Sequence, residues 1–320
     1  MRIFTGIMAA VLVAAAMPAF AQEYPTKPVR AIIAFPPGSA TDIIGRLITQ
    51  KVSEYWGQTV VPDNRGGAGG SIAAATAARA APDGYTLLIN SSAHAVNPSS
   101  FAKLSYDTLK DFIDIMPLVG MPNVLIVHPS SKMKALPDFL AEARANPGKI
   151  NFAFAGIGSG THLNTEKFKL ASKIEVTMVS YKGTAEAIID VMGGRVDTYF
   201  TPFSAALPFV QSGKVRALAV TTAKRAAQLP NVPTMAETGV PGFEFILWFG
   251  LWAPAGTPAP IVDKVWKDFN RAIADPAVRE KLVSLGNDTM TMTPAQFKKF
   301  VHREVVEYGN IFKAAGIKPQ

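Results

Sequence analysis

Apolar runs typical of strands alternate along the chain with stretches of helical spacing, and this alternation constrains the fold most. Residues 29–35 are rich in apolar and β-branched side chains, whereas residues 42–55 place Ile44, Leu47 and Ile48 on one helical face. Repeated alternation predicts an α/β architecture with mostly parallel sheets. Strands are expected at 29–35, 59–62, 86–90, 124–127, 150–154, 177–181, 198–200 and 215–221. Helices are expected at 42–55, 70–80, 136–146, 161–173, 185–193, 260–275, 277–285 and 294–315.

The N-terminal segment has the features of a secretory signal peptide. Arg2 supplies a positive charge, residues 7–16 are apolar but too few to span a bilayer, and Ala19-Phe20-Ala21 fits the cleavage signature. We therefore expect cleavage after Ala21 and a free periplasmic protein that begins at Gln22; an uncleaved membrane anchor is the alternative. The absence of cysteine from the sequence excludes a disulfide framework, a cysteine nucleophile, thiolate metal ligands and a lipid-modified cysteine.

Composition and charge favour a well-packed protein with a small acidic ligand. Hydrophobic residues make up 48% of the 320-residue chain, enough for a large core, and the net charge is +8. Loss of Arg2 with the signal peptide leaves 8 − 1 = +7. The lysines and arginines are scattered and form no basic stripe with interleaved aromatic residues, so no nucleic-acid partner is expected. A small anion fits the charge better.

Two loops about 120 residues apart have a composition suited to binding anions. Residues 35–42 and residues 154–162 each follow a strand-like run, consist largely of small residues and lead into a predicted helix. The first turn of a helix leaves backbone N–H groups unpaired, and the helix dipole adds positive potential there. Two such loops facing each other would bind a molecule that is negative at both ends. Neither contains a clear nucleophile and base, so we expect binding without chemistry.

Two extended apolar segments indicate the domain organisation. Residues 118–128 and 243–254 bracket about 120 residues with their own alternation of strands and helices. If both segments cross between domains, domain 1 consists of residues 22–121 plus 243–320 and domain 2 of residues 122–242. This discontinuous layout is that of a two-lobed clamshell. Two consecutive domains or one large sheet are the alternatives.

Eight short motifs, in order, resemble those of Bug-type receptors, the extracytoplasmic solute-binding proteins of tripartite tricarboxylate transporters. They are Tyr24-Pro25-Thr26-Lys27-Pro28-Val29-Arg30, Phe35-Pro36-Pro37-Gly38 with Thr41-Asp42, Asn64-Arg65-Gly66-Gly67-Ala68-Gly69-Gly70, Ala81-Pro82-Asp83-Gly84-Tyr85-Thr86-Leu87-Leu88, Gly158-x-Gly160-x-His162-Leu163, Tyr181-Lys182-Gly183, Gly193-Gly194-Arg195-Val196-Asp197 and Trp248-Phe249-Gly250-Leu251-x-Ala253-Pro254. The resemblance implies a type II periplasmic-binding-protein fold, a Venus-flytrap of two lobes hinged by two crossing strands. It also implies a small carboxylate ligand and delivery to a tripartite tricarboxylate-type membrane permease.

The resemblance places ligand binding in the two loops, which in this family oppose each other and bind carboxylates mainly through backbone N–H groups and bridging waters. Ser39 departs from the frequent second glycine of the family, and its hydroxyl either bonds the ligand or caps the helix before Asp42. The ligand-binding residues expected in the loops are Gly38, Ser39, Ala40 and Thr41 in the first and Gly158, Ser159, Gly160, Thr161 and His162 in the second.

Weaker candidates follow other strands. Ser92 and Ala93 come after residues 86–90, so they too should face the cleft. Lys182 lies at a carboxyl-side strand end, where open α/β sheets bind ligands, and either pairs with a carboxylate or is solvated. Of Trp248 and Phe249, one is expected to wall the cleft and the other to fill the core. The family often has tyrosine at Phe249, so the missing hydroxyl favours a more apolar ligand.

The sequence favours a binding protein over an enzyme. The histidines His94, His128, His162 and His302 have no zinc-site spacing, and no catalytic metal or cofactor is expected. Residues 64–70 lack a P-loop lysine, and residues 156–160 lack the third glycine of a dinucleotide site. Ser159 and His162 could form a nucleophile and base, but the couple has no evident orienting carboxylate, although Glu166 lies one helical turn further on. A monomeric receptor is expected; a ligand sensor for a signalling partner is the alternative, and ligand identity stays open.

Overall fold

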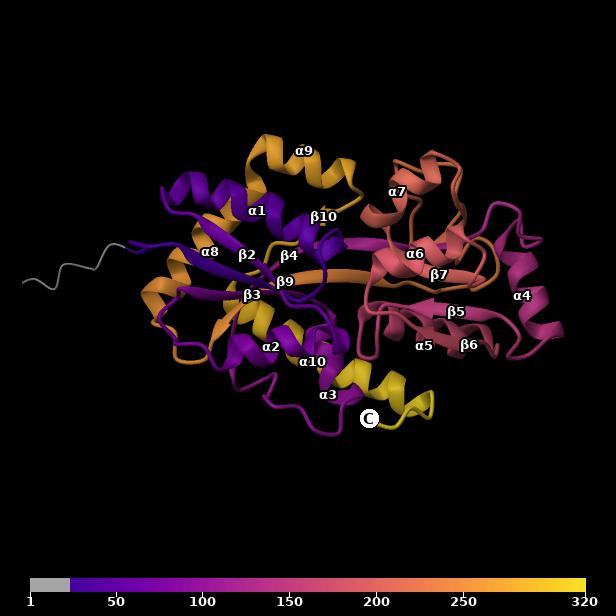
Figure 1. The fold of residues 1–320 in the computed structure, drawn as a ribbon, viewed down its shortest axis with the longest axis horizontal. Coiled ribbons are helices and arrows are strands. Elements are labelled where there is room, and N and C mark those ends of the chain that lie inside the picture. Colours follow the sequence, from indigo (N-terminus) through magenta and orange to yellow (C-terminus); the bar gives the residue numbers. More distant parts are fainter. Residues whose placement is uncertain (1–23) are drawn as a thin grey trace, which may run out of the picture.

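The computed structural model describes residues 24–320, and the expected signal peptide, residues 1–21, lies outside them. Strands and helices alternate along the described chain, as the sequence predicts (Figure 1). The strands are β1 (Val29–Ile33), β2 (Val60–Asn64), β3 (Thr86–Ser91), β4 (Phe112–Val127), β5 (Asn151–Phe154), β6 (Thr177–Ser180), β7 (Thr198–Pro202), β8 (Arg216–Val220), β9 (Ile246–Pro254) and β10 (Asp288–Thr289). The helices are α1 (Ala40–Trp56), α2 (Ser71–Ala78), α3 (Ala93–Ser100), α4 (Leu136–Ala145), α5 (Gly160–Ser172), α6 (Thr184–Met192), α7 (Phe203–Gln211), α8 (Ala259–Ala274), α9 (Pro276–Ser284) and α10 (Pro294–Ala314), with a short 3-10 turn η1 (Ala68–Gly70).

Two long strands, β4 and β9, connect the two halves of the molecule. β4 pairs with β9 from Phe112 to Pro122, and then with β7 from Asn123 and with β8 from Val124, in both cases up to Val127. The first lobe therefore contains β1, β2, β3, β9, β10 and the start of β4, and the second lobe contains the end of β4 and β5 to β8. Figure 1 shows α4 to α7 around the second lobe and the remaining helices around the first. The expected pair of crossing strands is confirmed.

The sheet is mixed rather than mostly parallel. β1 is parallel to β2 and β3, and β5 is parallel to β6 and β7. The crossing strands are antiparallel to each other, and so are the pairs β3–β9 and β4–β7. The reason is topological: the chain leaves the first lobe through β4 and returns through β9, so adjacent crossing strands must run in opposite directions.

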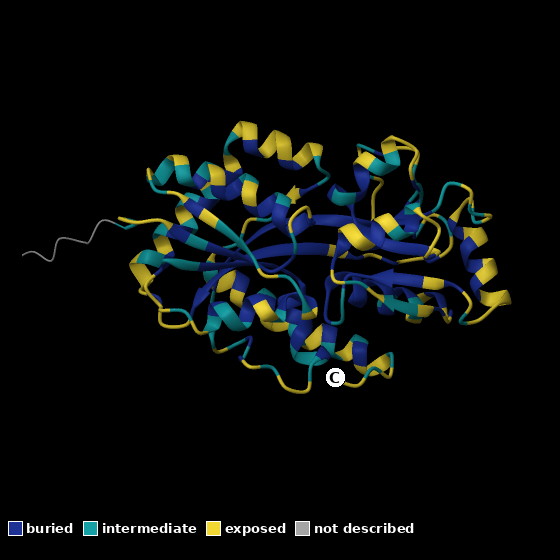
Figure 2. Ribbon diagram, viewed as in Figure 1, coloured by how far each residue is buried: buried dark blue, intermediate teal, exposed yellow. Residues whose placement is uncertain are grey.

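The core follows the strands, and exposed residues concentrate on the outer faces of the helices (Figure 2). Trp248 and Trp252 on β9 are almost wholly buried, and their indole N–H groups have partners. Trp252 Nε1 donates to Asp114 Oδ1 at 2.8 Å, and Trp248 Nε1 donates to the Tyr308 hydroxyl at 2.9 Å. Satisfied polar groups of this kind allow large aromatic side chains to be buried without a desolvation penalty.

Two helices were not expected from the sequence. α3 contains Pro98 and α7 contains Pro208, and proline within a helix removes a backbone donor and clashes with the preceding turn. Both helices nevertheless bury much of their surface, which outweighs the local preference. Within residues 24–320, no helix is long and apolar enough to cross a membrane.

Candidate functional site

The first of the two loops, residues 35–41, joins β1 to α1 and is held in shape by the start of that helix. Ser39 is the N-cap, and its Oγ accepts a hydrogen bond from the N–H of Asp42 at 3.3 Å. The Asp42 carboxylate in turn accepts from the N–H of Gly38 at 2.9 Å. Gly38 has a φ of +79°, a conformation that glycine adopts without strain. Of the two roles left open for Ser39, the structure shows the helix cap.

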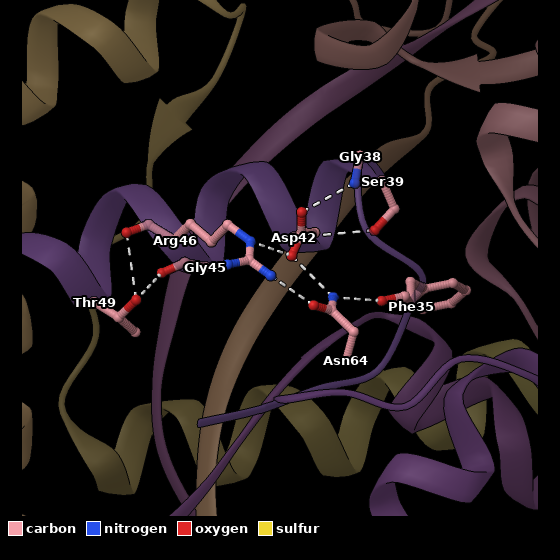
Figure 3. A network of polar contacts seen from close by, with 8 residues as sticks. All are labelled: Phe35, Gly38, Ser39, Asp42, Gly45, Arg46, Thr49 and Asn64. Atoms are coloured by element: carbon pink, nitrogen blue, oxygen red, sulfur yellow. Dashed lines mark hydrogen bonds and ion pairs between the residues drawn. The ribbon is translucent and has the colours of Figure 1, made fainter. Parts of the chain in front are cut away.

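A polar network anchors this loop to the neighbouring strand β2 (Figure 3). Asp42 Oδ1 accepts from Arg46 Nε at 2.7 Å and from Asn64 Nδ2 at 2.9 Å. Asn64 Nδ2 also donates to the carbonyl of Phe35 at 2.9 Å, and Asn64 Oδ1 accepts from Arg46 at 2.7 Å. The loop is therefore tied at both ends. Residues 64–70 thus begin with a supporting side chain, in line with a structural glycine turn rather than a phosphate cradle.

The second loop, residues 155–161, repeats the same arrangement between β5 and α5. Ser159 is the N-cap, and its Oγ accepts from the N–H of His162 at 3.1 Å. His162 Nδ1 accepts from the N–H of Gly158 at 3.3 Å. His162 therefore occupies the structural role of Asp42, three residues after the cap serine and four after the glycine. Burial, together with the nearby Lys169 ammonium, lowers the pKa of His162 to about 4, so its Nδ1 is free to accept at neutral pH.

The internal bonds leave two free backbone donors in each loop. The N–H groups of Gly38 and Gly158 are occupied, and those of Ser39 and Ser159 donate to carbonyls of their own loops at 3.2 Å and 3.0 Å. The N–H groups that come next, on Ala40, Thr41, Gly160 and Thr161, donate no hydrogen bond to any described residue. Each pair stands at the positive end of a helix of 13 or 17 residues.

These donors border a cavity between the lobes. Its volume is about 20 Å³ for the centres of water-sized molecules, room for about one or two waters. The lobes touch beside this cavity, since a Cβ on Gly69 of the first lobe would lie 2.2 Å from the carbonyl oxygen of Ile157 in the second, and the structure therefore shows the lobes together. The lining residues come mostly from the carboxyl ends of strands and the helix starts that follow: Phe35, Ser39, Ala40, Thr41, Ser91, Ala155, Ser159, Gly160, Thr161, Thr184, Pro202, Leu247 and Phe249.

The lining combines hydroxyl groups with apolar surface and contains no charged side chain. Thr161 Oγ1 lies 3.1 Å from Ser159 Oγ and accepts from the N–H of Ala155 at 3.0 Å. The hydroxyl of Thr184 accepts from Tyr199, and burial raises the pKa of Tyr199 to about 12, so its proton stays in place. An anion here would be held by backbone N–H groups, hydroxyls and helix dipoles rather than by lysine or arginine.

The structure brings together most of the residues expected at the site. Seven of them line the cavity: Ser39, Ala40, Thr41, Ser159, Gly160, Thr161 and Phe249. Six of them do not line the cavity. Gly38 and Gly158 lie one residue before the cap serines, and the His162 ring supports its own loop through Gly158. Ser92 and Ala93 stand at the start of α3, and Lys182 is exposed. The buried Ser92 Oγ has no partner among the described residues, and a Cβ on Gly160 would lie 2.8 Å from it.

The β9 strand separates the roles of its two aromatic residues. Phe249 and Leu247 face the cavity, whereas Trp248 points to the other side, towards Glu304 and Tyr308 on α10. Successive side chains of a strand point to opposite faces of the sheet, so Trp248 must face away from the cavity that Leu247 and Phe249 line. Sequence reasoning missed Phe35, Ser91, Ala155, Thr184, Pro202 and Leu247; for most of them the available signal was position, since they stand at carboxyl ends of strands, where α/β sheets bind ligands.

The geometry around Ser159 does not form a nucleophile and base. His162 gives its backbone N–H to Ser159 Oγ, while its ring Nδ1 accepts from Gly158. The other ring nitrogen, Nε2, lies 4.0 Å from the carboxylate of Glu166, which is bonded to Lys169. In residues 24–320 no group of three or more histidine, aspartate or glutamate side chains is arranged to hold a metal ion.

Comparison with known proteins defines the class of this chain. Residues 44–317 match the model of the tripartite tricarboxylate transporter family receptor. A protein from the tcbD-tcbE intergenic region of Pseudomonas sp. (strain P51) is 38% identical over 294 residues, which cover 92% of this chain and 88% of the relative. Protein BugT of Bordetella pertussis is 36% identical over 305 residues, which cover 95% of this chain and 94% of BugT.

Comparison with solved structures points to the same class of protein. The R. palustris protein Rpa4515 with adipate superposes with a TM-score of 0.89 at 36% identity, covering 93% of this chain and 100% of that one. The periplasmic binding protein BugD gives 0.89 at 35% identity with the same coverage. MatC of Rhodopseudomonas palustris with bound malate gives 0.85 at 32%, covering 90% and 99%.

The fold is thus that of a type II periplasmic binding protein, with two lobes hinged by two crossing strands. The chain belongs to the tripartite tricarboxylate transporter receptor family, in which Bug proteins are found. This is a family of solute-binding receptors and not of enzymes, as the sequence predicts.

Proposed function

We propose that this protein captures a small carboxylate in the interlobe cavity and delivers it to a tripartite tricarboxylate-type permease. The observation that carries the proposal is the duplicated loop: two helix starts, one from each lobe, each present two free N–H groups to one cavity. Four donors in two pairs fit the carboxylates at the two ends of a diacid. The acid is a dicarboxylate, a tricarboxylate or an aromatic carboxylate.

The solved relatives support a carboxylate ligand, since Rpa4515 was obtained with adipate and MatC with malate. The apolar surface of Phe249, Leu247 and Pro202 suits the carbon skeleton between two acid groups. On this proposal the binding residues are the seven cavity-lining residues expected from the sequence, while Gly38, Gly158 and His162 hold the loops in shape. Ser92, Ala93 and Lys182 have no proposed contact with the ligand.

The proposal includes export, a monomeric receptor and two domains, of which the first is discontinuous. Cleavage after Ala21 would release the mature chain into the periplasm. The partner of β4 changes between Pro122, which pairs with β9, and Asn123, which pairs with β7, one residue beyond the proposed domain boundary at residues 121 and 122. The second boundary, at residues 242 and 243, lies just before the chain returns as β9. Domain 1 would be residues 22–121 plus 243–320, and domain 2 residues 122–242.

Binding is tested on the mature protein with a panel of carboxylates. Thermal shift identifies ligands, because a molecule that binds only the folded state raises the melting temperature. Calorimetry should then give one site per chain with a dissociation constant near micromolar, which corresponds to about 8 kcal/mol. Binding of a neutral sugar or a cation, with no response to any carboxylate, would refute the proposal.

Delivery is tested separately in cells. Uptake of the labelled acid should require both this receptor and a tripartite tricarboxylate-type permease, and deletion of either gene should abolish it. If uptake persists without the permease while the protein still binds the acid, the protein is a receptor but this permease is not its transport partner.

A further inference from the structure

A buried amide in the first lobe reaches the second loop across the cleft. Asn97 lies on α3 and is completely buried. With its nitrogen turned towards two carbonyl groups, it donates to Ala93 O at 3.1 Å and to Gly158 O at 3.3 Å, while its oxygen accepts from the Tyr106 hydroxyl at 3.0 Å. The opposite orientation would leave the amide oxygen facing only acceptors, so hydrogen bonding selects this one. Ala93 and Tyr106 belong to the first lobe, and Gly158 belongs to the second.

Backbone glycines allow this close approach. A Cβ on Gly158 would lie 2.6 Å from the Asn97 side chain and 2.9 Å from Phe101. A Cβ on Gly69, in the η1 turn of the first lobe, would lie 2.2 Å from the carbonyl oxygen of Ile157. The second loop is therefore packed against the first lobe at backbone distance. These contacts exist only while the lobes are together.

The bonds of Gly158 connect closure to the shape of the loop. Its carbonyl is held by Asn97 from the first lobe, and its N–H is held by His162 within the second lobe. Two residues further on, Gly160 and Thr161 present the free donors of this loop. A constraint on Gly158 from the opposite lobe therefore limits the orientations available to those donors. Asn97 does not line the cavity, so it acts without touching the ligand.

We propose that Asn97 is a positioning residue that stabilises the closed form by holding the Gly158 carbonyl. When the lobes separate, water replaces Asn97 at that carbonyl. When they close on a variant without the amide donor, the carbonyl is buried without a partner. Loss of the Gly158 bond therefore penalises only the closed form, whereas the bonds of Asn97 to Ala93 and Tyr106 are lost in both forms. For ligand affinity the inference rests on the proposed function, whereas for closure itself it does not.

The test compares Asn97→Leu with Tyr106→Phe. Asn97→Leu keeps the side-chain volume but removes the donor to Gly158. Tyr106→Phe removes a first-lobe partner of the same amide and leaves the Gly158 bond intact, so it reports losses that concern only hydrogen bonding within the first lobe. Because the chain has no cysteine, dyes can be attached to cysteines introduced at Gln50 and Ala141, which are exposed on α1 and α4. Single-molecule energy transfer then measures the closed fraction.

Asn97→Leu should lower the closed fraction and weaken carboxylate binding by about five- to fiftyfold, mainly through faster dissociation. Tyr106→Phe should lower the melting temperature while closed fraction and affinity stay at the wild-type level. Wild-type closure and affinity in Asn97→Leu, or equal losses in both variants, would overturn the inference. If no carboxylate binds the wild-type protein, the proposed function fails, and the closed fraction without ligand still decides the role of Asn97.

Discussion

At the residue scale, a single backbone donor can be removed with little change to the fold. Ala40 is the first residue of α1, where proline is well accommodated, and Ser39 before it has the extended conformation that proline requires of its predecessor. Ala40→Pro therefore deletes one of the four free N–H groups. A charge-assisted hydrogen bond contributes about 1.5–3 kcal/mol, so affinity should fall at least tenfold with an unchanged melting temperature.

Calorimetry measures the affinity of Ala40→Pro, and Ala40→Val is the control for side-chain bulk. Ala40→Val adds similar volume but keeps the backbone N–H, so it should bind the carboxylate more tightly than Ala40→Pro. Ser159→Ala should mainly lower stability, by about 1 kcal/mol, because Ser159 caps α5. Equal affinities for Ala40→Pro and Ala40→Val would show that bulk, and not the donor, determines binding.

A second residue, His94, should make stability depend on pH. Its ring is packed against Phe112 and Trp252, and neither ring nitrogen has a partner among the described residues. Burial lowers the pKa of His94 to about 3, so between this value and about 6.5 the unfolded chain binds a proton that the folded protein does not. Stability should therefore fall as the pH is lowered through this window.

At pH 4.5 the contribution of His94 to this loss is about 2–3 kcal/mol. Urea denaturation at pH 7 and pH 4.5 measures it, and His94→Leu should show a smaller difference between the two values. Some dependence remains in that variant because the pKa of His162 is also lowered. A pH dependence equal to that of the wild type would exclude His94 as a source.

At the scale of elements, the strand and helix order and the two loops could be predicted, because hydrophobic periodicity and cap residues are local signals. α3 and α7 could not, since their prolines point to loops while tertiary burial decides otherwise. The contacts that hold the two loops in shape could not be predicted either. Asp42 and His162 share a role that only the fold reveals, and no local pattern pairs Asn64 with the Phe35 carbonyl.

The anchoring of the first loop by β2 gives a prediction at this scale. Asn64→Ala removes the bonds to the Phe35 carbonyl and to Asp42 and should loosen residues 36–42. We expect affinity to drop about three- to tenfold and amide hydrogen exchange in the loop to become faster. Asp63→Ala is the matched control, since Asp63 adjoins Asn64 but pairs with Arg30 and Arg65 instead of the loop. Similar loop exchange in both variants would contradict an anchoring role for Asn64.

At the scale of the whole molecule, ligand binding is coupled to closure because donors from two lobes meet at one cavity. The lobes touch beside the cavity, where Gly69 approaches Ile157 and Gly183 approaches Pro36, so a diacid that contacts both loops should enter while the lobes are apart. A ligand that bridges both loops must favour the closed form. A change that lowers the fraction of closed protein must therefore lower the apparent affinity by the factor by which that fraction falls. β4 runs from the first lobe into the second and β9 begins where the chain returns, so rotation should occur at these two crossings.

Gly183 offers a way to oppose closure from outside the cavity. It is the N-cap of α6 in the second lobe, and a Cβ there would lie 3.2 Å from Pro36 of the first lobe. Its φ of −174° suits any residue, and threonine is a favourable N-cap, so Gly183→Thr adds bulk only where the lobes meet. The variant should bind carboxylates about tenfold more weakly and retain its melting temperature without ligand, because opening relieves the clash.

Small-angle scattering distinguishes this mechanism from local damage. Gly183→Thr should have a larger radius of gyration than the wild type without ligand, and saturating ligand should bring the two together. The exposed neighbour Ala185 supplies the control: Ala185→Val adds bulk on the outer face of α6 and should change neither affinity nor scattering. If Gly183→Thr binds more weakly but scatters like the wild type with and without ligand, the pocket is rigid and closure does not control binding.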